Sequence, residues 1–213
     1  MRRRGALLLV GLAAHSLAAQ HGVRVDASPG IAALFVRSEV GPAVQTLKGI
    51  VPGAAGTIAW NRLSLDLGYW QGSLTADSSA ADRDVVEGQC LLGVTILPWL
   101  TARVGPHAWT YASTSGTQRW FMWEGRLHAD GLLLPDRLSS YFELWNAFTG
   151  DVNAAQSFSS GTGGEGGLTW RPRGTNAPVS GHLAYSVQQV RLGGGARKET
   201  VQRLLIAVGF RLR

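Results

Sequence analysis

Residues 119–131 read RWFMWEGRLHADG, which is the clearest strand pattern in the chain. Four of its odd-numbered positions carry apolar side chains, namely Phe121, Trp123, Leu127 and Ala129. Four of its even-numbered positions carry ionisable groups, namely Glu124, Arg126, His128 and Asp130. Because successive side chains of a β-strand point to opposite faces, one face of this strand is apolar and the other is charged. The stretch therefore predicts a strand that separates an apolar medium from a polar one.

The same alternation recurs along the chain. It is clear in residues 62–74, 85–97, 139–150, 179–192 and 203–212. It is weaker in residues 29–40, 43–59, 101–111 and 158–171, which are rich in glycine and alanine. Together the segments predict an all-β fold, a closed antiparallel transmembrane β-barrel of ten strands. Eight strands remain the alternative if two of the weaker segments are not strands.

Two of the weaker segments contain a proline, Pro52 in one and Pro106 in the other. Proline has no backbone N–H, so each of them removes one hydrogen bond from a strand ladder. We expect a β-bulge at each position, because a bulge accommodates an unpaired residue within a strand.

The N-terminus has the form of an export signal. Three arginines at positions 2–4 precede an apolar stretch at residues 5–14, and small residues follow at positions 16–19. Ten apolar residues are too few to span a bilayer as a helix, so the pattern predicts a cleaved signal peptide at residues 1–19 and a single barrel domain at residues 20–213. A short N-terminal anchor is the alternative.

Composition narrows the classes of function. Without the three arginines of the signal, 17 basic residues stand against 14 acidic ones, which gives no case for a nucleic-acid partner. Cys90 is the only cysteine, so the chain has no intramolecular disulfide. Cys90 falls on the apolar face of its segment and is interpreted as a small hydrophobic residue.

The connectors and the aromatic residues predict an orientation. Residues 60–62, 97–100 and 134–137 form short turns, whereas residues 76–84, 112–118, 151–157 and 193–198 form longer polar loops. Barrels of this kind have short periplasmic turns and longer external loops, so both termini are expected in the periplasm, with residues 172–178 as a long exception. We expect two aromatic girdles at the membrane surfaces. They are Trp60, Trp99 and Trp170 on the periplasmic side, and Trp70, Trp109, Tyr111 and Trp120 on the other.

If the apolar faces meet lipid, the polar faces line the lumen. The ionisable residues expected there are Asp66, Glu87, Arg103, His107, Glu124, Arg126, His128, Asp130, Glu143, Glu165, Arg171, His182 and Arg203, joined by Gln89 and Gln188. Charges of both signs inside a narrow barrel pair across strands, since an unpaired buried charge is costly. The pattern predicts a polar network that plugs the lumen, with a narrow water-filled pore as the alternative.

A barrel-embedded hydrolase or acyltransferase is a further alternative. His128 and Asp130 share a face, and Glu143 on the next strand faces the same way, so a histidine oriented by a carboxylate is possible. No serine or threonine accompanies His128 on its face. The inward candidates Ser64, Thr95 and Ser186 cannot be placed from the pattern. No spacing resembles a metal site, the glycine runs lack the residues of a phosphate loop, and no cofactor is expected.

The chain resembles the broad class of small bacterial outer-membrane β-barrel proteins. The signal at residues 1–19, the alternating strands and the C-terminal sequence AVGFRLR at residues 207–213 carry this resemblance. Such barrels typically end in an aromatic residue, whereas this chain ends in Arg213, with Phe210 and Leu212 just before it. The resemblance implies an outer-membrane location, with outer-membrane lipid, lipopolysaccharide and the barrel assembly machinery as partners.

The pattern does not settle the oligomeric state. The function expected from the sequence is non-enzymatic, either structural or in surface interaction. The alternatives are a narrow pore for small solutes and the lipid-modifying enzyme.

Overall fold

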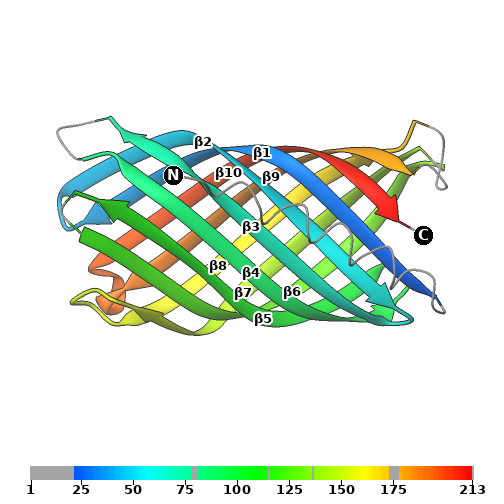
Figure 1. Ribbon diagram of the computed structural model, residues 1–213. Coiled ribbons are helices and arrows are strands. Elements are labelled where there is room, and N and C mark those ends of the chain that lie inside the picture. Colours follow the sequence, from blue (N-terminus) through cyan, green and yellow to red (C-terminus); the bar gives the residue numbers. More distant parts are fainter. Residues whose placement is uncertain (1–21, 78–80, 115, 136, 173–177, 213) are drawn as a thin grey trace.

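The computed structural model describes residues 22–77, 81–114, 116–135, 137–172 and 178–212, which form a closed antiparallel barrel of tilted strands (Figure 1). The predicted signal peptide lies outside the described residues. The elements in chain order are β1 (Val23–Val40), β2 (Ala43–Trp60), β3 (Leu63–Ala76), β4 (Arg83–Leu97), β5 (Leu100–Ser113), β6 (Gly116–Leu134), β7 (Leu138–Val152), β8 (Phe158–Trp170), β9 (Val179–Leu192), the 3₁₀ turn η1 (Gly193–Gly195) and β10 (Arg197–Leu212).

Each strand pairs with its neighbours in the sequence, and β1 pairs with β10 to close the barrel. The closing ladder runs from Val25 opposite Leu212 to Val40 opposite Arg197. Within the described ranges the strand number is therefore ten, and the weaker glycine- and alanine-rich segments are strands like the others. Closure leaves no strand edge unpaired, which is what a sheet needs in lipid.

The bulges expected at the two prolines are absent from the register. Pro52 lies opposite Ile31 in an unbroken β1–β2 ladder, and Pro106 lies opposite Trp123 on β6. On the other side of each proline the ladder is interrupted but resumes in the same register. A proline takes away one hydrogen bond without adding a residue, so no register shift is needed. The described register shifts lie elsewhere, at Thr95/Leu97, Trp123/Glu124, Leu132/Leu134 and Phe158/Ser160.

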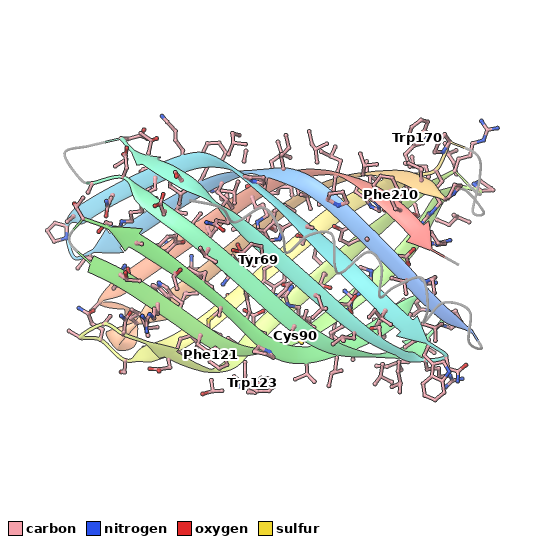
Figure 2. All side chains as sticks on the ribbon, viewed as in Figure 1. Tyr69, Cys90, Phe121, Trp123, Trp170 and Phe210 are labelled. Atoms are coloured by element: carbon pink, nitrogen blue, oxygen red, sulfur yellow. The ribbon has the colours of Figure 1, made fainter. Side chains whose placement is uncertain are left out.

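The outer surface of the barrel carries a broad apolar belt. Figure 2 shows Tyr69, Phe121, Trp123, Trp170 and Phe210 on the outside of the strands. Further exposed apolar residues of the belt include Ile31, Leu67, Leu92, Val104, Leu127, Leu144, Leu183, Leu204 and Ile206. Such a continuous surface is unstable in water and is the lipid-facing surface of a transmembrane barrel. No helix in the described ranges is long and apolar enough to cross a membrane.

The two ends of the barrel differ in their connectors. The end that holds the first residue of β1 and the last of β10 is called the terminus end, and the opposite end, with connectors 41–42, 77–82, 114–115, 153–157 and 193–196, is called the loop end. The short turns expected at the terminus end are present there, and Asn61 in one of them has a φ of 53°. The longer loops expected at the loop end are only partly present, because strands β5 and β6 extend through residues 112–113 and 116–118.

One expected aromatic girdle is present on the outer surface and the other is not. Trp60, Trp99 and Trp170 are exposed beside the terminus end. In contrast, Trp70, Trp109, Tyr111 and Trp120 point into the lumen and are buried, so their placement in an outer girdle was wrong. Parity along each strand fixes the face of a residue, and these four share the inward face.

The loop-end half of the lumen is filled by a cluster that we call the apolar plug. Leu74, Met122 and Leu192 in it are completely buried. Its members are Ala32, Leu34, Val36, Leu47, Val51, Trp70, Leu74, Val85, Trp109, Tyr111, Trp120, Met122, Ala147, Val152, Val190 and Leu192. The indoles of Trp109 and Trp120 stack with ring centroids 5.3 Å apart. The plug packs like the core of a soluble protein and was not predicted from the sequence.

Candidate functional site

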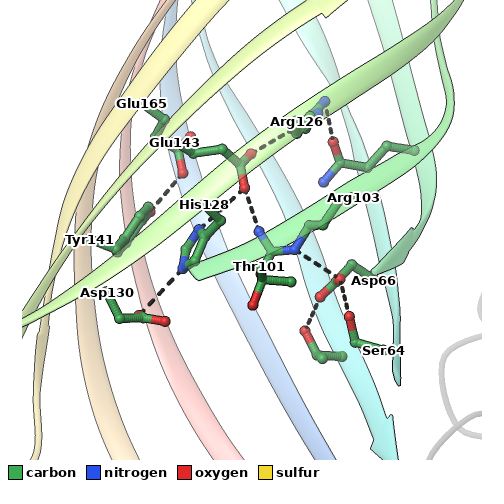
Figure 3. Close-up of polar contacts among 12 residues, drawn as sticks. Ser64, Asp66, Thr101, Arg103, Arg126, His128, Asp130, Tyr141, Glu143 and Glu165 are labelled. Atoms are coloured by element: carbon green, nitrogen blue, oxygen red, sulfur yellow. Dashed lines mark hydrogen bonds and ion pairs between the residues drawn. The ribbon is translucent and has the colours of Figure 1, made fainter. Parts of the chain in front are cut away.

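A network of charged side chains lies in the lumen between the apolar plug and the terminus end, and Figure 3 shows part of it. Its centre is Arg126 on β6, which donates to Glu124 at 2.7 Å, to Glu143 on β7 at 3.1 Å and to Gln89 on β4 at 3.0 Å. Glu124 is completely buried, and Arg126 and Glu143 are nearly so. A buried guanidinium shared by two carboxylates provides a counter-charge and hydrogen bonds for both.

The layer next to the plug is organised by His107 on β5. One ring nitrogen of His107 lies 3.0 Å from Glu87 and the other lies 3.0 Å from Glu124. Glu87 also pairs with Arg203 on β10, across the lumen. The chain of contacts from Arg203 to Arg126 therefore runs through two carboxylates and one imidazole, directly below the plug.

The layer nearer the terminus end is organised by Arg103 on β5. Arg103 pairs with Glu143 and lies 3.2 Å from Asp66 on β3. Asp66 also accepts hydrogen bonds from Thr57 at 2.5 Å and from Ser64 at 3.1 Å. Hydroxyl groups on two strands thus hold the carboxylate that in turn orients Arg103.

His128 links this layer to the mouth of the barrel. Its ring nitrogens lie 3.2 Å from Glu143 and 3.3 Å from Asp130, whose side chain is exposed at the terminus end. The register of the β6–β7 pair brings these groups together, because His128 on β6 lies directly opposite Glu143 on β7.

Three predicted lumen residues lie outside this network. Glu165 on β8 accepts a hydrogen bond from Tyr141 at 2.6 Å. His182 on β9 lies 2.8 Å from Ser180 and 3.0 Å from Thr169. Arg171 lies beyond the end of β8 and donates to Ser139 at 3.2 Å. Partial burial of the Arg171 guanidinium and the nearby positive charge of Arg211 lower the pKa of Arg171.

Sequence reasoning missed Glu199, a buried carboxylate at the loop end. Glu199 is 1% exposed and pairs with Arg197 at 3.4 Å, on the loop-end side of the plug. Arg197 lies over the ring of Trp120 at 5.6 Å, and Arg83 lies over the ring of Tyr111 at 5.9 Å. Glu199 alternates in step with Val201 and Arg203, so the sequence pattern could have predicted that it faces the lumen.

The groups of a catalytic triad are divided between two histidines. His128 contacts the carboxylates of Glu143 and Asp130, but none of its described hydrogen bonds involves a serine or threonine. His182 contacts the hydroxyls of Ser180 and Thr169, and its described hydrogen bonds involve no carboxylate. Among the described residues no group of three or more histidine, cysteine or acidic side chains could hold a metal ion.

A cavity of about 250 Å³ lies beside the charged network, on the terminus side of the plug. One wall carries Arg103, Arg126, His128 and Glu143. Much of the facing wall carries small side chains, namely Ser28, Ala55, Gly56, Ser186 and Ala207. Glycine shapes the adjoining part of strand β8, because a Cβ at Gly163 would overlap the Trp145 indole and a Cβ at Gly167 would overlap the Tyr141 ring.

Comparison with known proteins gives no family. No family model matches the chain, and no curated protein matches it in sequence. Several solved barrels are similar in structure. The attachment invasion locus protein Ail of Yersinia pestis is 11% identical over 90% of this chain and 99% of its own, with a TM-score of 0.40. Neisserial surface protein A is 13% identical over 90% of this chain and 96% of its own, with a TM-score of 0.34.

The outer membrane channel DcaP of Acinetobacter baumannii is 8% identical over 84% of this chain, with a TM-score of 0.39. The match spans only 62% of the length of DcaP. The fold of the present chain follows from its own strand pairing and outer belt: it is an all-β, closed, ten-stranded barrel of the outer-membrane type.

Proposed function

We propose that the chain is a non-enzymatic outer-membrane protein whose lumen is closed, with a structural role in the envelope. Residues 1–19 act as the cleaved export signal, and residues 20–213 form the barrel. The terminus end faces the periplasm and the loop end faces outward, as is usual for bacterial barrels.

The observation that carries this proposal is the filling of the lumen by two layers of opposite character. The apolar plug occupies the loop-end half, where Leu74, Met122 and Leu192 are completely buried. The layer of Glu87, His107 and Glu124 lies directly beneath it. A conducting pore needs a continuous path of water, and a closely packed apolar layer interrupts that path.

The outer surface of the loop end supports lipopolysaccharide as a partner. Beyond the apolar belt it carries both signs of charge, with Lys48 2.7 Å from Asp77 and Lys198 3.8 Å from Glu39. Such charges suit a layer of lipid headgroups. Connectors such as 41–42 and 114–115 are too short to build a large adhesive surface. We expect the barrel assembly machinery to insert the chain despite its C-terminal arginine.

The division of triad groups between His128 and His182 supports a non-enzymatic role. Catalysis by a serine needs nucleophile, base and orienting carboxylate in contact. The carboxylates lie with His128 and the hydroxyls lie with His182. His128 also faces the lumen, where it has no access to lipid chains.

Conductance across a planar lipid bilayer tests the proposal. The refolded chain is expected to give no steady current. A double variant, Trp120→Gly with Leu74→Gly, opens the plug and is expected to raise conductance if it still folds. Phe148→Gly on the lipid-facing surface is the matched control, because the Phe148 side chain is exposed on the outside of the barrel. Steady channels from the unaltered chain would contradict the closed lumen and favour the narrow pore.

A further inference from the structure

The cavity beside the charged network holds two opposite charges that do not pair with each other. Arg203 on β10 is the register partner of Ser186 on β9, and Ser186 is the register partner of Glu165 on β8. All three side chains line the cavity. Ser186, a small hydroxyl residue, therefore lies between Arg203 and Glu165 in one row of the sheet, while the Arg203 guanidinium also pairs with Glu87 across the lumen.

The carboxylate of Glu165 forms no direct ion pair among the described residues. Its described hydrogen bond is the one from the Tyr141 hydroxyl at 2.6 Å, and none of the ion pairs among the described residues includes it. Its register partner Glu143 is also acidic, but Glu143 is neutralised by Arg103 and Arg126. A carboxylate that lines a lumen without a direct ion pair is costly unless it is protonated or is solvated by water or a cationic ligand.

Three buried N–H donors in the same lining are also unpaired. They are the side-chain nitrogens Nε of Arg203, Nε2 of Gln188 and Nε1 of Trp145, none of which has a hydrogen-bond acceptor among the described residues. Gln188 is 9% exposed and Trp145 is 8% exposed. A buried donor without an acceptor costs about 1–3 kcal/mol, so an acceptor that these side chains turn to meet would be stabilised. In the free protein the three nitrogens have almost no accessible surface, so binding requires the side chains to rotate toward the ligand.

We propose that this cavity binds a small zwitterion, an amino-acid-like molecule with one carboxylate and one ammonium group. The carboxylate lies toward Arg203 and Gln188, and the ammonium lies toward Glu165. Ser186 offers a hydroxyl to either group. The inference goes beyond the proposed structural role, which requires only that the lumen be closed.

The size of the cavity fits such a ligand. Arg203 and Glu165 lie on the two strands that flank Ser186, two strands apart in the sheet. A cavity of about 250 Å³ has room for one small amino-acid-like molecule.

Entry is from the terminus end. The apolar plug closes the loop end of the lumen, and the cavity lies on the other side of it. The proposed orientation of the barrel makes this the periplasmic side. The site would therefore exchange its ligand with the periplasm and would not provide a path between the periplasm and the exterior.

Isothermal titration calorimetry of the full chain, refolded in detergent, tests the site. The probes are glycine, L-alanine and 4-aminobutanoate, which differ in the separation of their charges, together with propionate and propylamine, which carry one charge each. We expect saturable binding of at least one zwitterion and much weaker binding of both singly charged probes. Failure of all three zwitterions to bind, or equal binding of propionate, would overturn the proposal.

Variants separate the site from general effects on the barrel. Glu165→Gln removes the unpaired charge at constant size, and we expect about tenfold or greater loss of affinity for the zwitterion. Ser186→Leu fills the cavity and is expected to abolish binding without removing a charge. Glu39→Gln, on the outer surface at the loop end, is the matched control and should bind normally.

Each variant is first checked for a compact band that shifts only on boiling. If Glu165→Gln fails this check, Ser186→Leu decides the matter. Unchanged affinity in a folded Glu165→Gln or Ser186→Leu barrel would overturn the proposed site. Conductance of the same preparation reports separately on the closed lumen, so failure of one proposal is distinguishable from failure of the other.

Discussion

The two halves of the barrel are built with opposite polarity. Around the middle and the terminus end, the outer face is apolar and the inner face is charged, as Leu144 outside and Glu143 inside illustrate. Nearest the loop end the inner face is apolar and the outer face is charged, as Leu47 inside and Lys48 outside illustrate. The inner part of the plug still lies within the apolar belt, since Met122 stands between outward Phe121 and Trp123. The first arrangement suits lipid and the second suits water. The comparison indicates that the strands continue beyond the membrane as a short soluble-type barrel with its own core.

The largest expected effect comes from the charged interior of the membrane half. Arg126→Met leaves Glu124 and Glu143 buried without their shared cation and should lower the free energy of unfolding by about 3–5 kcal/mol. Urea unfolding in lipid vesicles measures it. Arg37→Met is the matched control, because Arg37 pairs with Glu39 on the exposed outer surface, where a pair contributes about 0–1 kcal/mol. Equal losses in the two variants would contradict a buried network.

The apolar plug gives the next largest effect. Leu74→Ala creates a cavity among completely buried neighbours and should cost about 2–5 kcal/mol in the same unfolding assay. Leu144→Ala is the matched control on the lipid-facing surface, where lipid chains fill the vacated space and no cavity forms. Leu144→Ala should therefore lower the free energy of unfolding by less than Leu74→Ala does. A Leu74→Ala variant as stable as Leu144→Ala would mean that the loop-end half has no packed core.

Arginine substitutions on the outer surface locate the boundary between the two halves. Leu144→Arg places a charge in the apolar belt and should cost about 2–4 kcal/mol if it lies near the bilayer midplane. Ser73→Arg places the same charge on the outer face of the loop-end half, next to Asp84, and should cost about 0–1 kcal/mol. Vesicle-based unfolding compares the two. Similar costs would show that the belt extends to the loop end or that neither surface meets lipid.

Much of the fold was predictable because period-two alternation is a local property of the chain. The strands, their number and the inward parity of residues such as Arg126 and Glu143 follow from it. The plug is not predicted by alternation, because alternation shows that the two faces of a strand differ in polarity and does not show that the same face stays apolar along the whole strand. The sequence of β10 does carry a sign of the plug. Its outward residues change from apolar Leu204 and Ile206 to charged Lys198 toward the loop end, and in the same part of the strand the inward residue Val201 is apolar.

The alternation pattern does not predict which side chains contact each other across the lumen. Parity places His128 and Glu143 on one face, and the short 135–137 turn makes them neighbours. The pairing of Arg203 with Glu87 joins residues 116 positions apart in sequence, and it depends on closure of the barrel. The same holds for the zwitterion cavity, which arises where small residues of β1, β2, β9 and β10 face long side chains across the lumen.

Cysteine accessibility along β9 tests the division of the lumen most directly. In a Cys90→Ala background, Ser186→Cys places a thiol in the cavity and Val190→Cys places one in the plug, on the same face of one strand. A small water-soluble thiol reagent should label Ser186→Cys quickly and leave Val190→Cys unlabelled until the barrel is unfolded. Equal rapid labelling of both positions in the folded barrel would contradict the account, because water would then pass through the loop-end half.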